Sequence, residues 1–211
     1  MTVSWIATDS DYHAEMARPK ITQDSVIDVA ERMIDTDGLD ALSARRISAE
    51  LGVSRQVIYT HFSGMHELFE ALLHRSGLEL AASVENLTQP TGSDERVRAS
   101  AHAYVAFARR RPALFELTFG RPVPGYTPSP ETTEALRNVF LSHVVGLIDD
   151  WSTANKHDLG RKAIVERTRV YWSATHGLVT LERAGHSSER ETDTLVDEAV
   201  RALLAGWRHP Q

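Results

Sequence analysis

The sequence contains no cysteine, which excludes disulfide bonds and thiolate chemistry and fits a reducing cytoplasm. It also has no run of about 18 apolar residues, so we expect no membrane-spanning segment and no membrane partner. The first 20 residues carry early acids and no apolar core, which is unlike a secretion signal. We therefore expect a cytoplasmic protein of ordinary globular composition, with 42% hydrophobic and 25% charged residues.

An excess of positive charge is missing as well, because the formal net charge is −6 at pH 7. This balance excludes a protein that coats nucleic acid without regard to sequence, although it allows a positive face of limited extent. From Ser43 to His66 there are three arginines and a single glutamate, which is a weak basic excess. Charge alone therefore decides little about function.

Catalytic signatures are absent too. The sequence has no H-E-x-x-H motif, no Walker phosphate loop, no G-x-S-x-G elbow and no dinucleotide-binding glycine run. Asp149 and Asp150 are adjacent carboxylates, but successive residues of a helix point about 100° apart and make a poor chelating pair. We therefore expect no enzymatic activity, no cofactor and no bound metal.

Helical patterns fill the chain from residue 20 onward. Thr22 is typical of an N-cap, apolar residues follow at helical spacing, and Gly38 ends this first helix. A second helix is predicted from Ser43 to about Leu51, and a third over residues 54–62. A longer helix, with an apolar face, follows them.

The rest of the chain is helical in pattern and is interrupted by a proline-rich loop at residues 121–130. The predicted helices span residues 97–111, 113–120, 131–151 and 189–207. A further long helix is predicted after the polar segment TANKHDLG and ends at Gly185. We predict an all-α fold with three parts. They are a flexible arm at 1–19, a three-helix helix-turn-helix domain at 20–80, and a larger helical domain at 81–211.

The segment between Ser43 and Phe62 has the layout of a helix-turn-helix. Gly52 lets the backbone reverse without a Cβ clash, while Ile47 and Val53 set the angle between the two helices. On spacing alone, a plain helical hairpin with a polar outer face stays open as an alternative.

The outer face of the third helix carries side chains that suit DNA. Arg55 can hold guanine and Gln56 can hold adenine, each through two hydrogen bonds. Tyr59, Thr60 and His61 suit phosphate contacts, which set the register without reading the sequence. This face is the candidate base-reading surface.

A family resemblance centres on the stretch ISAELGVSRQVIYTHFSGMHELFEAL, which is similar to the DNA-binding domain of the TetR family. It covers residues 20 to about 75, including the first helix. It implies a homodimer that binds a pseudo-palindromic double-stranded DNA operator. The matching positions are Ile47, Gly52, Val53, Ser54, Tyr59, His61, Phe62 and Leu68.

The resemblance also implies roles for single residues. Ser43 and Arg45 would contact phosphate or a flanking base, and Lys20, with Thr22, would touch the DNA backbone. The family usually has a lysine near the start of its fourth helix, where this chain has His66, so we expect a weaker or pH-sensitive phosphate contact there. The reading helix would present Ser54, Arg55, Gln56, Tyr59, Thr60 and His61.

In the second half, Trp172, His176 and Gly177 resemble a W-x-x-x-H-G pattern of one TetR subfamily. This likeness implies a pocket between the middle helices and a dimer interface made by the last two long helices. We expect a repressor that a small apolar or aromatic effector releases from DNA. The candidate ligand-binding residues are Tyr104, Phe107, Phe115, Phe119, Phe140, Trp172 and His176; for each one singly, an ordinary core position is the alternative.

The final helix carries an apolar stripe at Val196, Val200, Leu203 and Trp207. Such a stripe favours core or dimer seam over a ligand site. An alternative function stays open for the second half, namely that it binds a protein partner rather than a small molecule.

Overall fold

The protein is described by a computed structural model that covers residues 20–120, 123, 125–157 and 159–208, with the side chain of Phe140 excepted. The expected flexible arm at residues 1–19 lies outside these residues. The described residues form helices and turns and contain no strand, so the predicted all-α class is confirmed.

The N-terminal domain begins with α2, whose start is fixed by a reciprocal cap. The hydroxyl of Thr22 accepts a hydrogen bond from the Ser25 amide, and the Ser25 hydroxyl accepts one from the Thr22 amide. Gly38 ends α2 with a backbone φ of 81°, a conformation that residues with a side chain rarely adopt. The elements are α2 (Gln23–Asp37), the 3-10 turn η1 (Leu39–Ala41), α3 (Ala44–Glu50), α4 (Arg55–His61) and α5 (Met65–Glu85).

In the described part of the chain the C-terminal domain has five further helices, and the first turns of three of them are capped by Ser93, Ser129 and Ser188. Ser93 accepts a hydrogen bond from the Arg96 amide at the start of α6, and Ser129 accepts one from the Thr132 amide at the start of α8. The helices are α6 (Asp94–Arg110), α7 (Pro112–Phe119), α8 (Pro130–Ala154), α9 (Arg161–Arg183) and α10 (Glu189–Arg208).

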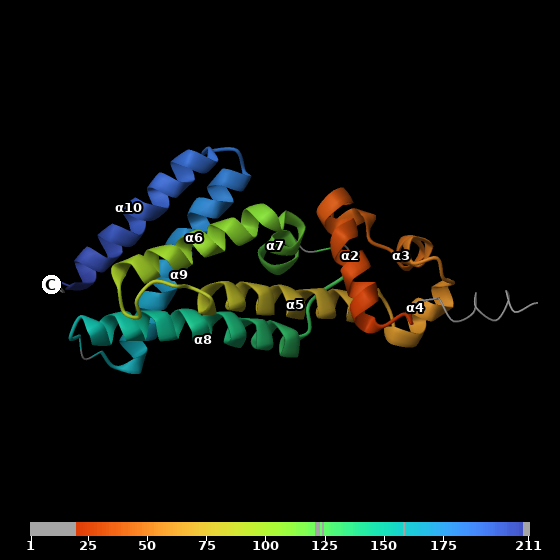
Figure 1. Ribbon diagram of the computed structural model, residues 1–211, viewed down its shortest axis with the longest axis horizontal. Helices are drawn as coiled ribbons and strands as arrows, with labels where there is room; N and C mark the ends of the chain where they lie inside the picture. Colours follow the sequence, from red (N-terminus) through yellow and green to blue (C-terminus); the bar gives the residue numbers. More distant parts are fainter. Residues whose placement is uncertain (1–19, 121–122, 124, 158, 209–211) are drawn as a thin grey trace, which may run out of the picture.

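Helix α5 belongs to both halves of this elongated molecule (Figure 1). Its first turns lie beside α2, and the rest runs alongside α8. It continues without a break through residue 80, where we expect the domain boundary. The helix-turn-helix elements α3 and α4 lie at the opposite end of the molecule from the end of α10.

One hydrophobic core runs through both halves. Ile34 and Ile47 are almost fully buried in the N-terminal domain, as are Leu114 and Trp151 in the C-terminal domain, and all belong to one cluster. Burial of each such side chain stabilises the fold by about 1.5–3 kcal/mol. A movement of α5 or α7 therefore changes the packing in both domains.

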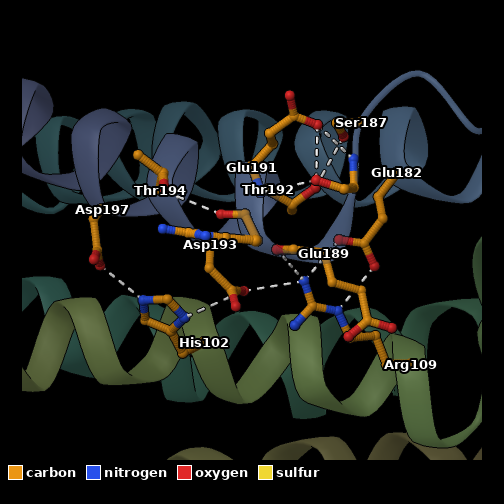
Figure 2. Close-up of polar contacts among 12 residues, drawn as sticks. His102, Arg109, Glu182, Ser187, Glu189, Glu191, Thr192, Asp193, Thr194 and Asp197 are labelled. Carbon is orange, nitrogen blue, oxygen red and sulfur yellow. Dashed lines mark hydrogen bonds and ion pairs between the residues drawn. The ribbon is translucent and has the colours of Figure 1, made fainter.

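Polar contacts fasten α10 to α6 and α9 (Figure 2). The guanidinium of Arg109 donates to both carboxylate oxygens of Glu182, at 2.8 and 2.7 Å, and lies 3.0 Å from Asp193. His102 Nε2 lies 2.7 Å from an Asp197 carboxylate oxygen. Planar two-point contacts of this kind fix orientation as well as distance. These three helices thus form a stiff unit away from the helix-turn-helix.

Among the described helices, we find none whose length and apolar character would let it pass through a bilayer.

Candidate functional site

The turn between α3 and α4 is built as a helix-turn-helix requires. Gly52 has φ 66°, in the left-handed region that favours glycine. The Ser43 hydroxyl accepts from the Arg46 amide and caps α3. Ile47 and Ile58, 0% and 2% exposed, pack the two helices against the domain core. The position of α4 is therefore set by buried contacts, and its outer face is left free.

That outer face carries the side chains predicted from the sequence. Arg55, Gln56, Tyr59 and Thr60 are all exposed, and 48% of the Tyr59 surface is accessible. The Thr60 hydroxyl donates to the carbonyl of Val57 at 2.7 Å, which holds its oxygen close to the helix. The four side chains follow one another along a single surface at the far end of the molecule.

The free cations at this end lie on both helices and ahead of α2. Arg45 on α3 and Arg55 on α4 are exposed and have no ion pair within the described part of the chain, and the same holds for Lys20. Arg46 differs, because it forms an ion pair with Asp37. Three cations are thus available to an anionic partner, although the whole chain is acidic.

Of the three other predicted residues Ser43, Ser54 and His61, Ser43 and His61 are half-buried, and Ser54 is exposed. The Ser43 hydroxyl already serves as a helix cap, whereas Ser54 is exposed and makes no capping hydrogen bond with its side chain. His61 is half-buried at the end of α4, and its carbonyl accepts from Gln23 Nε2 at 2.8 Å. His61 therefore helps to join α4 to α2.

The start of α5, where we expect a weakened phosphate contact, is engaged by the protein itself. His66 Nε2 lies 3.1 Å from the carbonyl oxygen of Thr127, in the loop before α8. The Glu67 carboxylate accepts a 2.7 Å hydrogen bond from the Ser63 amide, which lowers the pKa of Glu67. A carboxylate in the first turn of a helix also interacts favourably with the helix dipole.

A cavity of about 510 Å³ lies between α5, α7, α8 and α9. Its volume is in the range of small-molecule sites. The lining residues are Leu73, Ser76, Gly77, Leu80, Thr118, Phe119, Pro128, Thr133, Leu136, Arg137, Leu141, Arg169, Trp172 and Ser173.

Two of the seven predicted ligand-binding residues, Phe119 and Trp172, line this cavity. The other described residues of that prediction lie outside its lining. Phe107 is fully buried in the core, and the side chain of Phe140 lies outside the described structure.

The aromatic cluster behind the cavity centres on His176. The Tyr104 hydroxyl lies 2.8 Å from His176 Nδ1, and the Phe115 and His176 rings stack with centroids 5.7 Å apart. Burial lowers the pKa of His176, which favours the neutral ring. Phe119 and Trp172 also contact this ring, so the cluster forms a wall that supports the cavity.

Most lining residues are not among the predicted ones, because the prediction rests on aromatic side chains. The floor is made by Leu73, Gly77 and Leu80 of α5, whose spacing is that of an ordinary core face. One available signal was Ser76-Gly77, two small residues in the middle of an apolar helical pattern. Small residues leave room between packed helices, and this pair lies in the wall of the cavity.

The outer face of α9 and α10 exposes apolar side chains. Val170, Leu181 and Leu195 are 50%, 48% and 45% exposed. The apolar stripe predicted on the last helix does not belong to this outer face: Val196 and Val200 are buried within the chain, in agreement with a core position. A shallow groove on the outer face is lined by Ala174, Leu178, Leu195, Glu198, Ala199 and Ala202.

Within the described ranges, no group of three or more His, Asp or Glu side chains is placed to hold a metal ion.

Two protein families match this chain. Residues 26–72 match the family described as bacterial regulatory proteins of the tetR family. Residues 97–203 match the tetracyclin repressor-like C-terminal domain. The two matches fall on the helix-turn-helix and on the helical domain that contains the cavity.

Individual relatives agree with this assignment. The uncharacterized HTH-type transcriptional regulator Rv0681 of Mycobacterium tuberculosis is 26% identical over 192 residues, which cover 90% of this chain and 84% of that regulator. The HTH-type transcriptional repressor DrrR1 of Streptomyces coeruleorubidus is 30% identical over 63% of this chain and 47% of its own length. A protein of unknown function from Rhodococcus sp. RHA1 has a similar structure, with a TM-score of 0.76 and 25% identity over 90% of this chain and 97% of that one.

Proposed function

The chain belongs to the TetR family of bacterial regulatory proteins, and from this premise we propose that it is a repressor of transcription that binds a specific DNA operator. The observation that carries the proposal is the exposed face of α4. Arg55 and Gln56 project there with no competing ion pair among the described residues. An α-helix fits the major groove, where arginine and glutamine distinguish guanine and adenine.

The cations nearby would supply affinity without sequence preference. Arg45 lies on α3, which packs against α4, and Lys20 lies just ahead of α2; both are exposed. Neutralising phosphates releases counterions, so each such contact makes binding more sensitive to salt. In this proposal Arg55 and Gln56 specify the site, while Arg45 and Lys20 hold the domain against the DNA backbone.

The second copy would dock on the outer face of α9 and α10. This face exposes Val170, Leu181 and Leu195 around a shallow groove, which is an unusual amount of apolar surface for a solvated face. A twofold axis there would place two α4 helices on one side of the dimer. The operator would be a pseudo-palindrome whose half-sites lie about 34–36 Å apart.

Effector binding would act through α5. Leu73, Gly77 and Leu80 of this helix line the cavity, while Leu68 and Phe69, about one to three turns earlier, are buried in the helix-turn-helix core. An apolar or aromatic effector that shifts α5 against α8 would therefore reposition α4. A coupling of about 1–3 kcal/mol is enough to release DNA at cellular effector levels.

A protein partner in place of the second copy is the alternative for the C-terminal domain. The same apolar face of α9 and α10 would receive it. Gel filtration separates the two: a stable dimer of the purified chain favours self-association, and a monomer favours a different partner.

Selection of DNA from fragmented genomic DNA of the source organism tests the proposed function. We expect the purified protein to enrich a few fragments that share an inverted repeat. Uniform recovery of fragments, with no shared repeat, would reject a sequence-specific regulator.

A further inference from the structure

We propose that the cavity takes an amphipathic carboxylate, with its apolar body against α5 and its carboxylate at Arg137 and Arg169. This inference rests on the proposed function, in which the cavity is the effector site. Among the described residues of the lining, Arg137 and Arg169 are the two that carry charge, and none is acidic. A cavity whose charge is only positive favours a ligand with a negative group.

The lining changes in polarity from one side of the cavity to the other. Leu73, Gly77 and Leu80 on α5 are buried and form an apolar floor. Arg137 on α8 and Arg169 on α9 are exposed and lie at the mouth, together with exposed hydroxyl side chains from the same two helices. An apolar chain that enters with its charged end last would match both regions.

The polar groups near the floor already have partners. The Ser76 and Thr118 hydroxyls lie 3.1 Å apart, and Thr118 donates to the carbonyl of Leu114 at 2.7 Å. These oxygens therefore do not require a polar group on the part of the ligand that lies deepest. That part can be hydrocarbon without leaving a buried hydrogen-bonding group unpaired.

The two arginines differ in how free they are. Arg169 has no ion pair in the described part of the chain, whereas Arg137 pairs with Glu134 one turn earlier on α8. Both partners of that pair are more than half exposed, at 59% and 51%, and such surface pairs are weak. A bound carboxylate would therefore gain most from Arg169, and Arg137 would add a smaller share by turning away from Glu134.

Three ligands of equal chain length separate charge from hydrocarbon: decanoate, decan-1-ol and decylamine. Isothermal titration calorimetry of the full chain measures each dissociation constant at neutral pH. We expect decanoate to bind at least tenfold more tightly than decan-1-ol, and decylamine to bind more weakly than both. Tenfold corresponds to about 1.4 kcal/mol. The decanoate constant should also weaken as salt increases.

Charge-removing variants locate the carboxylate. Arg169→Gln should raise the dissociation constant of decanoate about tenfold and leave that of decan-1-ol unchanged. Arg137→Gln should have the same effect to a smaller degree. Arg161→Gln is the matched control, because Arg161 is an exposed arginine on the same helix that lies outside the cavity lining. Arg161→Gln should leave the dissociation constants of all three ligands unchanged. Circular dichroism checks that each variant keeps its helical fold.

The inference is overturned if decan-1-ol binds as tightly as decanoate, if none of the three ligands binds, or if Arg169→Gln and Arg161→Gln behave alike. The first and third outcomes would indicate a neutral effector and the second an effector of another chemical class; in each case the proposed function would stand. The converse failure is distinct. Arginine-dependent decanoate binding that leaves operator affinity unchanged would support the carboxylate site and contradict the proposed effector-controlled repressor.

Discussion

The guanidinium of Arg111, at the turn between α6 and α7, lies 2.9 Å from the carboxylate of Asp35 on α2. The same side chain lies 3.0 Å from Glu31 on α2 and 3.5 Å from Glu79 on α5. One arginine of the cavity domain is thus bound to the first helix of the DNA-binding domain and to the helix that the two domains share. This contact offers a route from the cavity to the position of α4.

Replacement of Arg111 should weaken the junction between the domains. Arg111→Gln removes the cation of Asp35, which is 27% exposed, and leaves Glu31, which is 13% exposed, with Arg75 alone at 3.8 Å, so we expect a loss of about 2 kcal/mol in the free energy of unfolding. Urea denaturation measures it. Arg110→Gln is the matched control, because Arg110 is 57% exposed and lies 3.7 Å from Glu79; it should cost less than about 0.5 kcal/mol. Equal losses for the two variants would contradict the role of Arg111.

Substitutions on α3 and α4 should separate recognition from attachment. Gln56→Ala removes a side chain that can read a base edge, so we expect a changed base preference at one operator position, at a cost of about 1–3 kcal/mol. Arg45→Ala removes a cation placed to meet phosphate, so it should weaken binding with little change in preference and reduce the salt dependence. Fluorescence anisotropy on operator and random duplexes measures both. If Gln56→Ala loses the same affinity on both duplexes, Gln56 does not read bases.

Filling the floor of the cavity should reduce ligand uptake. A Cβ atom at Gly77 would lie 2.7 Å from Cδ2 of Leu136, the flexible end of a side chain that lines the cavity. In Gly77→Ala, Leu136 can turn into the cavity, so we expect at least fivefold weaker ligand binding and little change in stability. Gly146→Ala on α8 meets no atom within 4 Å and serves as the control, with ligand binding unchanged. Unaltered binding in Gly77→Ala would show that ligand does not reach α5.

The histidine that joins α8 to α5 should make stability depend on pH. His143 Nε2 lies 2.6 Å from Glu85, while its other ring nitrogen contacts the Val139 carbonyl. The backbone contact with Val139 and the pairing with Glu85 raise the pKa of His143 despite partial burial. The stabilisation is complete below about pH 6.5, the ordinary value, and is lost as the pH rises through the higher pKa of the folded state.

Comparison of the wild type with His143→Gln isolates this effect from the other histidines. Glu85 is 63% exposed, so we expect a difference of only about 0.5 kcal/mol at pH 6 that shrinks toward pH 8. Thermal unfolding across that range measures it. A difference that is constant or grows with pH would contradict the assignment.

The sequence was informative where structure is local. Thr22, Gly38 and Gly52 predict helix ends through hydrogen bonds and backbone angles that depend on a few neighbours, and these ends lie where predicted. The start predicted for α8, at about residue 131, agrees with Pro130, whereas the start predicted for α6, at residue 97, is about one turn late. The polar first turn of α6, after Ser93, lacks the apolar spacing on which the prediction depends.

The cavity and the interdomain contacts could not be predicted in the same way. Leu73 and Leu80 line a cavity only because α8 and α9 pack at a particular distance from α5. The spacing of residues along one helix does not determine the distance between helices. Arg137 and Arg169 lie on different helices, so it is tertiary packing that brings both of them to the mouth of the cavity. The exposed face of α4 was easier to predict, since it follows from the period of one short helix.

Hydroxyl-radical footprinting of the purified protein on its enriched genomic fragment tests the central claim most directly. The account predicts two protected half-sites related by a twofold axis, with centres about 34–36 Å apart on one face of the duplex. Protection should be lost from both half-sites in Arg55→Ala. Protection without a repeated half-site, or a footprint that Arg55→Ala leaves intact, would contradict operator recognition by α4.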